Sequence, residues 1–430
     1  MFTLIVILFV LGYAAIAFEH PLKVNKAAPA ILTGMAVWTC IMLGHAQLFP
    51  AGHGGPEHLV DELYHHLSGI ASILFFLLGA MTVVELMDAH AGFQVITDRI
   101  NTRDRRVLLW LVGVLTFFLS AMLDNLTTAI VMAALLRKLV ADRNDLWTYA
   151  GVVIIAANAG GAWSPIGDVT TIMLWIDGQV TTWNIILKLI VPSLVCLVLP
   201  LLWIGLSMKG NITRREVQED PNVARVSKRE QYTVFFLGLA TLLGVPLFKA
   251  ATHLPPFMGI MFGLAILWAY TEFIHTRSME DRGQYQVTAI LRKVDHTGIL
   301  FFLGILIAVA GLETAGHLTL LSTRLSDTLG SIYVINAAIG VLSAVVDNVP
   351  LVAAAQGMYS LQTFPPDHTF WELLAYCAGT GGSMLIIGSA AGVAVMGVLG
   401  IDFMWYLKRM SVPAAIGYFG GLAAFWLLWH

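Results

Sequence analysis

Leu119-Ser120-Ala121-Met122-Leu123-Asp124-Asn125 decides how this chain is organised, because the pattern returns as Leu342-Ser343-Ala344-Val345-Val346-Asp347-Asn348. The two copies are 223 residues apart, and flanking motifs repeat at offsets between 221 and 225. One flanking motif is Gly160-Gly161, which returns as Gly381-Gly382. Each copy also places an Asp-Asn pair in the middle of a long apolar segment. The sequence therefore predicts an internal repeat with the same polar pair in both halves.

The composition predicts that both halves lie in a membrane. Of the 430 residues, 58% are hydrophobic and 12% are charged, whereas about 25% of a typical soluble domain is charged. So few charges cannot cover the surface of a soluble protein of this length, so we predict an all-α polytopic membrane protein surrounded by a lipid bilayer. The three cysteines lie in apolar stretches without metal-site spacing. We expect no cofactor, and the net charge of −3 gives no reason to expect a nucleic-acid partner.

Two kinds of apolar segment can be distinguished. Eight stretches are close to the roughly 20 residues that cross a bilayer, at about 2–18, 27–49, 67–88, 183–206, 232–250, 257–275, 297–314 and 411–429. Residues 107–136 and 332–364 are interrupted by the Asp-Asn pairs, and we predict a re-entrant hairpin at each. Residues 147–180 and 371–400 contain Gly-rich breaks and are predicted to be broken helices.

This pattern divides the chain into two inverted-topology repeats joined by a linker. Residues 1–206 form the first repeat, 207–231 a cytoplasmic linker and 232–430 the second repeat. Each repeat has five spans, including one broken helix, plus one re-entrant hairpin, and an odd number of crossings inverts the second repeat. The layout puts 21 of the 24 Lys and Arg residues, Lys23 and Lys26 among them, on the cytoplasmic side. Segment 50–66 lies outside as a loop. Such inverted repeats are typical of secondary transporters.

The hairpin tips and helix breaks are expected to meet, because irregular backbone inside a membrane is tolerated only where it is buried in protein or lines a cavity. There they would gather oxygen-bearing side chains, the ligands of hard cations. The residues predicted for ion binding and proton exchange are Ser120, Asp124, Asn125, Thr127, Thr128, Asn158, Ser164, Asp168, Ser343, Asp347, Asn348, Thr380, Ser383 and Ser389.

Within this set we predict sodium at Asp124, Asn125, Asp347 and Asn348. Ser120 and Ser343 precede the paired Asp residues by four positions, a spacing that would put both oxygens on one helical face.

A carboxylate inside a membrane is costly when it is ionised and empty. Each Asp is therefore expected to hold either a proton or a cation, and alternating access of such a site gives cation/proton exchange. An alternative remains for Asp124, Asp347 and Asp168, which could each cap the N-terminus of a half-helix. Possible accessory residues, which lie toward helix ends, are Glu85, Asp88, His90 and Glu313.

These motifs resemble the NhaD-type sodium/proton antiporters of the ion transporter superfamily. The resemblance rests on Ser120–Thr128, on Asn158–Thr171 and on Ser343–Pro350, and it extends over essentially the whole chain. Symporters of that superfamily carry Ser-Asn-Thr at the hairpin tips, whereas Asp124 and Asp347 replace the Ser here. The resemblance implies exchange of sodium, and of lithium, for protons in a bacterial inner membrane, with a role in pH homeostasis. It also implies a homodimer in which the hairpins and broken helices move against a scaffold.

Two alternatives remain open. An arsenite or sodium-coupled anion transporter of the same superfamily would share the architecture, but it would be favoured by a basic or Cys-containing site. An intramembrane aspartyl protease also uses two membrane Asp residues, but Asp124 and Asp347 are both followed by Asn rather than lying in the signatures of such enzymes. We therefore expect a transporter and not an enzyme.

Overall fold

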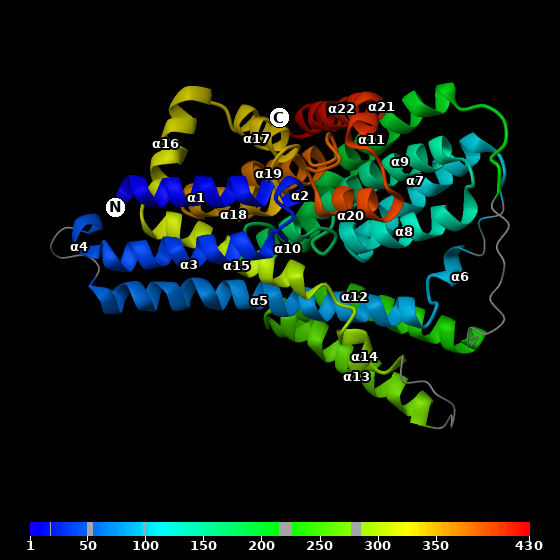
Figure 1. The fold of residues 1–430 in the computed structure, drawn as a ribbon, viewed down its shortest axis with the longest axis horizontal. Helices are drawn as coiled ribbons and strands as arrows, with labels where there is room; N and C mark the ends of the chain where they lie inside the picture. The colour runs from blue at the N-terminus through cyan, green and yellow to red at the C-terminus, as the bar shows by residue number, and fades with distance from the viewer. Residues whose placement is uncertain (18, 50–54, 98–99, 101, 215–225, 277–284) are drawn as a thin grey trace.

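Every extended secondary-structure element is a helix within the residues that the computed structural model describes, which are 1–17, 19–49, 55–97, 100, 102–214, 226–276 and 285–430. Figure 1 shows their arrangement. By length and composition seven of these helices can cross a membrane, or nine if each of two bent pairs is one span. The predicted all-α, multi-pass membrane protein is confirmed.

In the described residues the N-terminal part of the chain contains six helices, and the first three of them pack into one layer. These six helices are α1 (Phe2–Ala17), α2 (Glu19–Leu22), α3 (Ala27–Leu43), α4 (His45–Leu48), α5 (Pro56–Ala89) and α6 (Gln94–Thr97). Helix α3 packs against α1 and, most extensively, against α15 (His296–Thr314). This second contact needs glycine, because a Cβ on Gly304 would lie closer than 3.0 Å to the backbone of Ile31.

The prediction of a loop at 50–66 is wrong for residues 56–66, because these residues form the beginning of α5. Gly55 precedes the helix and Pro56 occupies its first position, where a missing N–H is tolerated. No further Pro or Gly interrupts the chain before Gly69. Helix α5 therefore has 34 residues, a length of about 50 Å at 1.5 Å per residue. Residues 50–54 lie outside the described part of the chain.

The first interrupted segments are each split into two helices. Segment 107–136 becomes α7 (Arg105–Met122) and α8 (Asn125–Leu139), which pack against each other. Segment 147–180 becomes α9 (Arg143–Ala162) and α10 (Val169–Ile176), followed by α11 (Thr182–Ser207). From Tyr149 to Ala162 the residues of α9 are buried, so this broken helix forms part of the core.

In the described residues the second half contains matching pairs, a short helix at 287–291 that was not predicted, and two further unpredicted helices beside sharp bends. It begins with α12 (Lys228–Thr252), α13 (Pro256–Thr276) and α14 (Val287–Leu291). Segment 332–364 becomes α17 (Ile332–Ser343) and α18 (Asn348–Met358), and segment 371–400 becomes α19 (Thr369–Gly381) and α20 (Ala390–Leu399). The additional helices are α16 (His317–Leu329), bent by 115° from α17, and α21 (Phe403–Arg409), bent by 118° from α20. The chain ends with α22 (Ser411–Trp429), which packs on α11.

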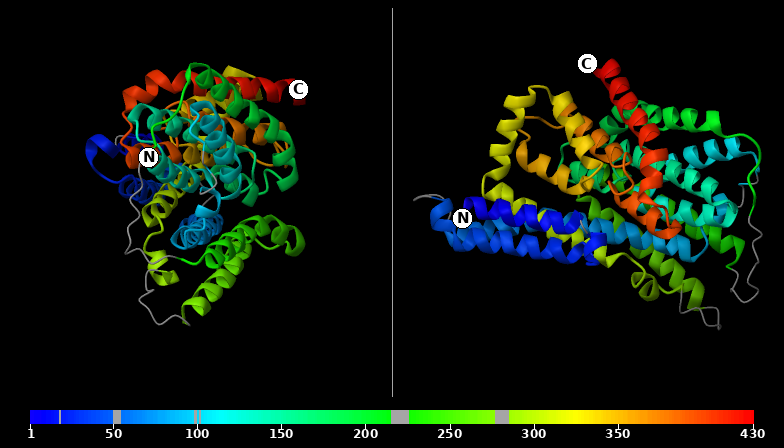
Figure 2. Two further views of the ribbon diagram at one scale, coloured as in Figure 1. Left: turned by 90° about the vertical axis from the view of Figure 1, so that its right-hand side faces the viewer. Right: turned by 45° about the horizontal axis from the view of Figure 1, so that its top comes forward.

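The layers place the interrupted helices together. Figure 2 shows α12 and α13, in green, on the far side of α5 from the group that contains α7–α9 and α19. Helices α9 and α19 contact each other inside that group, and α19 is buried from Phe370 to Gly381. The breaks after these helices are therefore held in the interior.

Several contacts recur at the offset of the sequence repeat. Ser120 Oγ donates to the carbonyl of Ala157 at 2.6 Å, and Ser343 Oγ donates to that of Ala378 at 2.7 Å. Gly160 faces the Phe117 carbonyl, and its counterpart Gly381 faces the backbone of Gly340. These contacts support the repeat. Its boundaries and its inverted topology stay predictions, and residues 215–225 of the linker lie outside the described residues.

Candidate functional site

Four helices begin and four end at one place in the interior. Helices α8, α10, α18 and α20 start there, directly after the breaks that end α7, α9, α17 and α19. A helix N-terminus carries partial positive charge and a C-terminus partial negative charge. The N-termini therefore stabilise carboxylates, while the C-termini offer carbonyl oxygens to a cation.

All three predicted Asp residues cap a helix, which is the alternative that the sequence left open. Asp124 caps α8 by accepting from the N–H of Thr127 at 2.7 Å. Asp168 caps α10 together with Thr171 in a capping box, and Asp347 caps α18 through Val349 N–H at 3.3 Å. In the second broken helix the position that corresponds to Asp168 is Ser389, which caps α20. The three Asp residues also make contacts other than their caps, and these other contacts differ from one Asp to the next.

Asp168 joins both hairpin tips. Its Oδ2 accepts from the Nδ2 of Asn125, and from the Nδ2 of Asn348 at 3.3 Å. Its Oδ1 accepts from the N–H and the hydroxyl of Thr170 at 3.0 and 2.9 Å. With 1% of its surface exposed, this carboxylate is buried and surrounded by hydrogen-bond donors.

Asn158 extends the network to the second broken helix. Its Oδ1 accepts from Asn125 at 3.1 Å, and its Nδ2 donates to Ser389 Oγ at 3.0 Å. Asn125, Asn158, Asp168, Asn348 and Ser389 are all buried. Residues from both halves of the sequence thus form one hydrogen-bonded group around a single carboxylate.

Asp124 has a different environment and an unusual backbone. Its Oδ2 accepts from the hydroxyl of Thr127 at 2.7 Å, so both carboxylate oxygens accept from the same residue. Its φ of 152° and ψ of 165° lie in a region that is almost exclusive to glycine and costs a side-chain-bearing residue about 1–3 kcal/mol. Nearby, the hydroxyl of Thr128 is buried and has no hydrogen-bond partner in the described part of the chain.

The predicted serine ligands serve the backbone. Ser120 and Ser343 donate to backbone carbonyls of α9 and α19, as given above. Helices α7 and α17 end before Asp124 and Asp347, so no continuous helix connects each Ser with the Asp four residues later. The expectation that each Ser shares a helical face with its Asp is therefore wrong. Ser164 Oγ donates to Ala121, Ser383 Oγ to Thr380 and Thr380 Oγ1 to Tyr376, each to the carbonyl oxygen.

A small cavity lies at the centre of the site. It has a volume of about 30 Å³ and is lined by all three Asp residues and both tip Asn residues, Asp124, Asn125, Asp168, Asp347 and Asn348. That volume is enough for a water molecule or a small ion. Among the described residues no group of three or more His, Cys, Asp or Glu is placed to share a metal ion, so any cation bound here also needs amide, hydroxyl or carbonyl oxygens.

Two larger cavities contain most of the predicted accessory residues. One of about 480 Å³ is lined by Glu313 together with Glu62, His65, His66 and Asp177. Another of about 270 Å³ is lined by Glu85, Asp88, Thr127, Lys293 and Asp295. His90 lines neither of them; it is buried, and its ring lies 3.8 Å from Glu230. The accessory acids therefore lie in cavities outside the central network.

Sequence reasoning missed Lys26. Its ammonium lies 3.2 Å from Asp347 Oδ2, although the basic-residue count had assigned it to a cytoplasmic loop. The count uses the sign of a side chain and its place along the chain, and neither shows that the start of α3 reaches a hairpin tip.

Comparison with known proteins identifies the family. The profile of the family described as "CitMHS: Citrate transporter" matches residues 13–373. Sodium/proton antiporter 2 of Arabidopsis thaliana is 43% identical over 97% of this chain and 98% of its own length. The Na(+)/H(+) antiporter NhaD of Vibrio cholerae is 32% identical over 99% of this chain and 91% of its own length. The chain belongs to the NhaD-type sodium/proton antiporter family.

One further relative and one solved structure are also similar to this chain. Sodium/proton antiporter 1 of Arabidopsis thaliana is 47% identical over 97% of this chain and 71% of that protein. The solved structure of Neisseria gonorrhoeae MtrF, whose title describes a class of antimetabolite efflux pumps, superposes with a TM-score of 0.50 at 12% identity. It covers 93% of this chain and 94% of that one. At so low an identity the likeness concerns the fold alone.

Proposed function

We propose that this NhaD-type protein exchanges sodium for protons across a membrane. The observation that carries the proposal is the central cavity, in which three carboxylates and two amides from both halves of the sequence surround a space of ionic size. The plant and bacterial relatives carry names that describe the same exchange.

The geometry supports different roles for the three carboxylates. Asp168 holds both tips through Asn125 and Asn348 and accepts hydrogen bonds from four donor groups. Asp124 and Asp347 have fewer fixed donors and keep oxygen lone pairs for a proton or a cation. In an interior that penalises an empty charge, sodium and protons compete for these two carboxylates and bind them in turn.

An anion substrate is the second candidate, because the family description names a citrate transporter. Carboxylate recognition needs donors, yet the amide donors of Asn125 and Asn348 already bind Asp168. Three Asp residues lining so small a cavity would also repel an anion. The site therefore favours a cation, and nothing in it favours arsenite, because Cys40, Cys196 and Cys377 do not line it.

Peptide cleavage fits the geometry less well. An aspartyl protease needs two carboxylates that share a proton and activate one water, whereas Asp124 and Asp347 cap separate helices in different halves of the fold. We propose that the protein is not an enzyme. Lithium transport, a bacterial inner membrane, a homodimer and a role in pH homeostasis stay predictions that follow from the family resemblance.

Removing either exchanging carboxylate is expected to stop transport. Asp124→Asn and Asp347→Asn keep a capping side chain, since Asn caps helices as well as Asp does, but they cannot hold a proton or balance a cation. Sodium-driven proton movement in proteoliposomes should fall by about 100-fold, the equivalent of roughly 3 kcal/mol. A pH-sensitive dye inside the vesicles measures it.

The matched control is Asp402→Asn, which changes an exposed Asp that caps α21 through Trp405 N–H. It should exchange like the wild type. Uptake of radiolabelled citrate by the same vesicles tests the anion alternative. Sodium-independent citrate uptake, or full exchange activity in Asp124→Asn, would refute the proposed function.

A further inference from the structure

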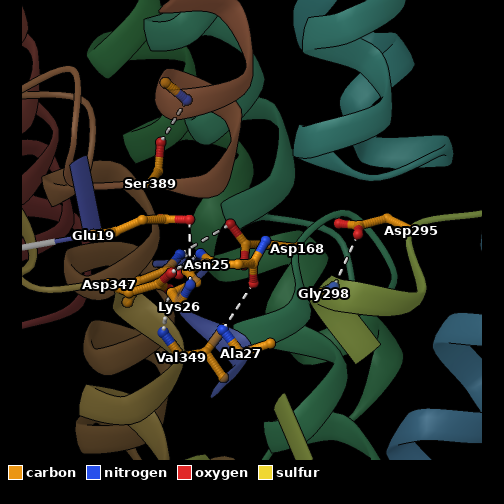
Figure 3. Close-up of polar contacts among 12 residues, drawn as sticks. Glu19, Asn25, Lys26, Ala27, Asp168, Asp295, Gly298, Asp347, Val349 and Ser389 are labelled. Atoms are coloured by element: carbon orange, nitrogen blue, oxygen red, sulfur yellow. Dashed lines mark hydrogen bonds and ion pairs between the residues drawn. The ribbon is translucent and has the colours of Figure 1, made fainter. Parts of the chain in front are cut away.

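Lys26 forms an ion pair with the second hairpin tip. Its Nζ lies 3.2 Å from Asp347 Oδ2, and 24% and 15% of the two side chains are exposed. Figure 3 shows Lys26 pointing toward Asp347 beside Asp168. The contact joins positions 321 residues apart, so the fold and not the local sequence creates it.

Two further contacts fix the position of this lysine. The backbone N–H of Lys26 donates to Glu19 Oε1 at 3.2 Å. Its ammonium also lies over the ring of Phe301, 4.2 Å from the ring centre, a favourable arrangement for a cation on an aromatic face. The side chain is therefore aimed into the site by α2 and α15 rather than extending freely into water.

The pair lies beside a cavity of its own. Tyr13, Glu19, Lys26 and Asp347 line a space of about 70 Å³ next to the central site. The charged or titratable residues that share these two cavities with Asp347 are Tyr13, Glu19, Lys26, Asp124 and Asp168. Lys26 is the one cation among them in the described part of the chain.

The corresponding Asp of the first hairpin is bound differently. Asp124, the counterpart of Asp347, accepts hydrogen bonds from Thr127, while Asp347 accepts from an ammonium. An ammonium and a sodium ion each present a single positive charge to a carboxylate. Lys26 therefore occupies the place on Asp347 that a transported cation would need.

We propose that Lys26 is a tethered cation that binds Asp347 while no transported ion is there and is displaced when sodium arrives. The inference rests on the proposed function, and it adds a residue that sets the apparent sodium affinity. Lys26 is a positioning residue: its ammonium neutralises the vacant carboxylate and links the α1–α3 layer to the second hairpin. Sodium binding to Asp347 would free the ammonium and release that link.

The first test separates charge competition from a structural role. Lys26→Gln should lower the KM for sodium about fivefold, the change in affinity that corresponds to losing a partly exposed ion pair, with a smaller change in the maximal rate. Lys26→Arg, which keeps the charge, should have a KM near that of the wild type. Lys23→Gln is the control, because Lys23 is exposed and lies three residues earlier. A lower rate at unchanged KM in Lys26→Gln would overturn the proposal.

The second test uses the unmodified protein and needs no variant to fold. Purified protein is treated with a small amine-acylating reagent, in sodium chloride or in an equal ionic strength of a bulky organic cation chloride, and modification at Lys26 relative to Lys23 is measured by mass spectrometry. Displacement by sodium predicts that acylation of Lys26 rises with sodium concentration while that of Lys23 stays constant. Acylation that does not depend on sodium would refute the inference.

The two proposals can fail separately. If the wild type exchanges sodium but neither the KM of Lys26→Gln nor the acylation of Lys26 responds as stated, the inference about Lys26 is wrong and the exchange function stands. If sodium releases Lys26 but drives no proton movement, the exchange function is wrong and the displacement of Lys26 stands.

Discussion

Asp168→Asn is expected to abolish exchange, with a larger loss than any other single substitution at the site. The Asn side chain would turn an NH₂ group or a neutral oxygen toward the amides of Asn125 and Asn348, which now donate to one carboxylate. Each buried donor left without an acceptor costs about 1–3 kcal/mol. Both hairpin tips would lose their common anchor. Dye-reported exchange should fall by more than about 100-fold, a loss of roughly 3 kcal/mol.

The control for Asp168→Asn tests the capping interpretation directly. Asp142 also caps a helix, accepting from Asp145 N–H at 2.9 Å at the start of α9, but it is exposed. If capping were the whole role of Asp168, Asp168→Asn and Asp142→Asn would behave alike, because Asn is an equally good cap. We expect Asp142→Asn to keep full exchange. Size-exclusion profiles and thermal unfolding in detergent show whether each variant is folded.

Gly160→Ala and Gly381→Ala are expected to destabilise the protein severely. A Cβ on Gly160 would lie closer than 3.0 Å to the Phe117 carbonyl, and one on Gly381 would lie equally close to the Gly340 carbonyl. Both obstacles are backbone atoms, so relief requires the packed helices to separate. Such overpacking costs about 1–3 kcal/mol and sometimes more. Because Ser120 and Ser343 bind across the same helix pairs, the separation would also break their hydrogen bonds.

Gly397→Ala is the matched control, since nothing lies within 4 Å of the added methyl group on α20. There the better helix propensity of Ala should leave the unfolding temperature unchanged or slightly higher. Folded yield and thermal unfolding in detergent measure the three variants. A Gly160→Ala protein that unfolds at the wild-type temperature would contradict the close packing of α7 on α9.

The sequence predicted the positions of the breaks because local chemistry determines them. Asp and Ser before an apolar run favour helix N-termini, and glycine permits the close approach of backbone that Gly160 and Gly381 make. The apolar spans could be predicted for a similar reason, since composition alone separates them from loops. We could also predict that the hairpin tips and helix breaks lie together, because irregular backbone inside a membrane has to be buried in protein.

The partners of individual side chains could not be predicted. Nothing local indicates that Asp168 accepts from both Asn125 and Asn348, because that depends on how the two halves pack. The contact of Lys26 with Asp347 was missed for the same reason. Helix α16 was missed because its sequence is too polar for a span, and segment 56–66 because its charges suggested a loop although its residues permit a helix.

The backbone of Asp124 implies that selection for a stable fold and selection for transport oppose each other at this position. At a φ of 152°, glycine is the residue that the conformation tolerates best, yet glycine has no carboxylate. In a library of all amino acids at position 124, a ranking by abundance of folded protein should place Gly first, while a ranking by growth under sodium stress should place Asp first. Such inverted rankings are the signature of a residue kept for activity at the expense of stability. A substitution at this hairpin tip that stabilises the fold would therefore abolish transport.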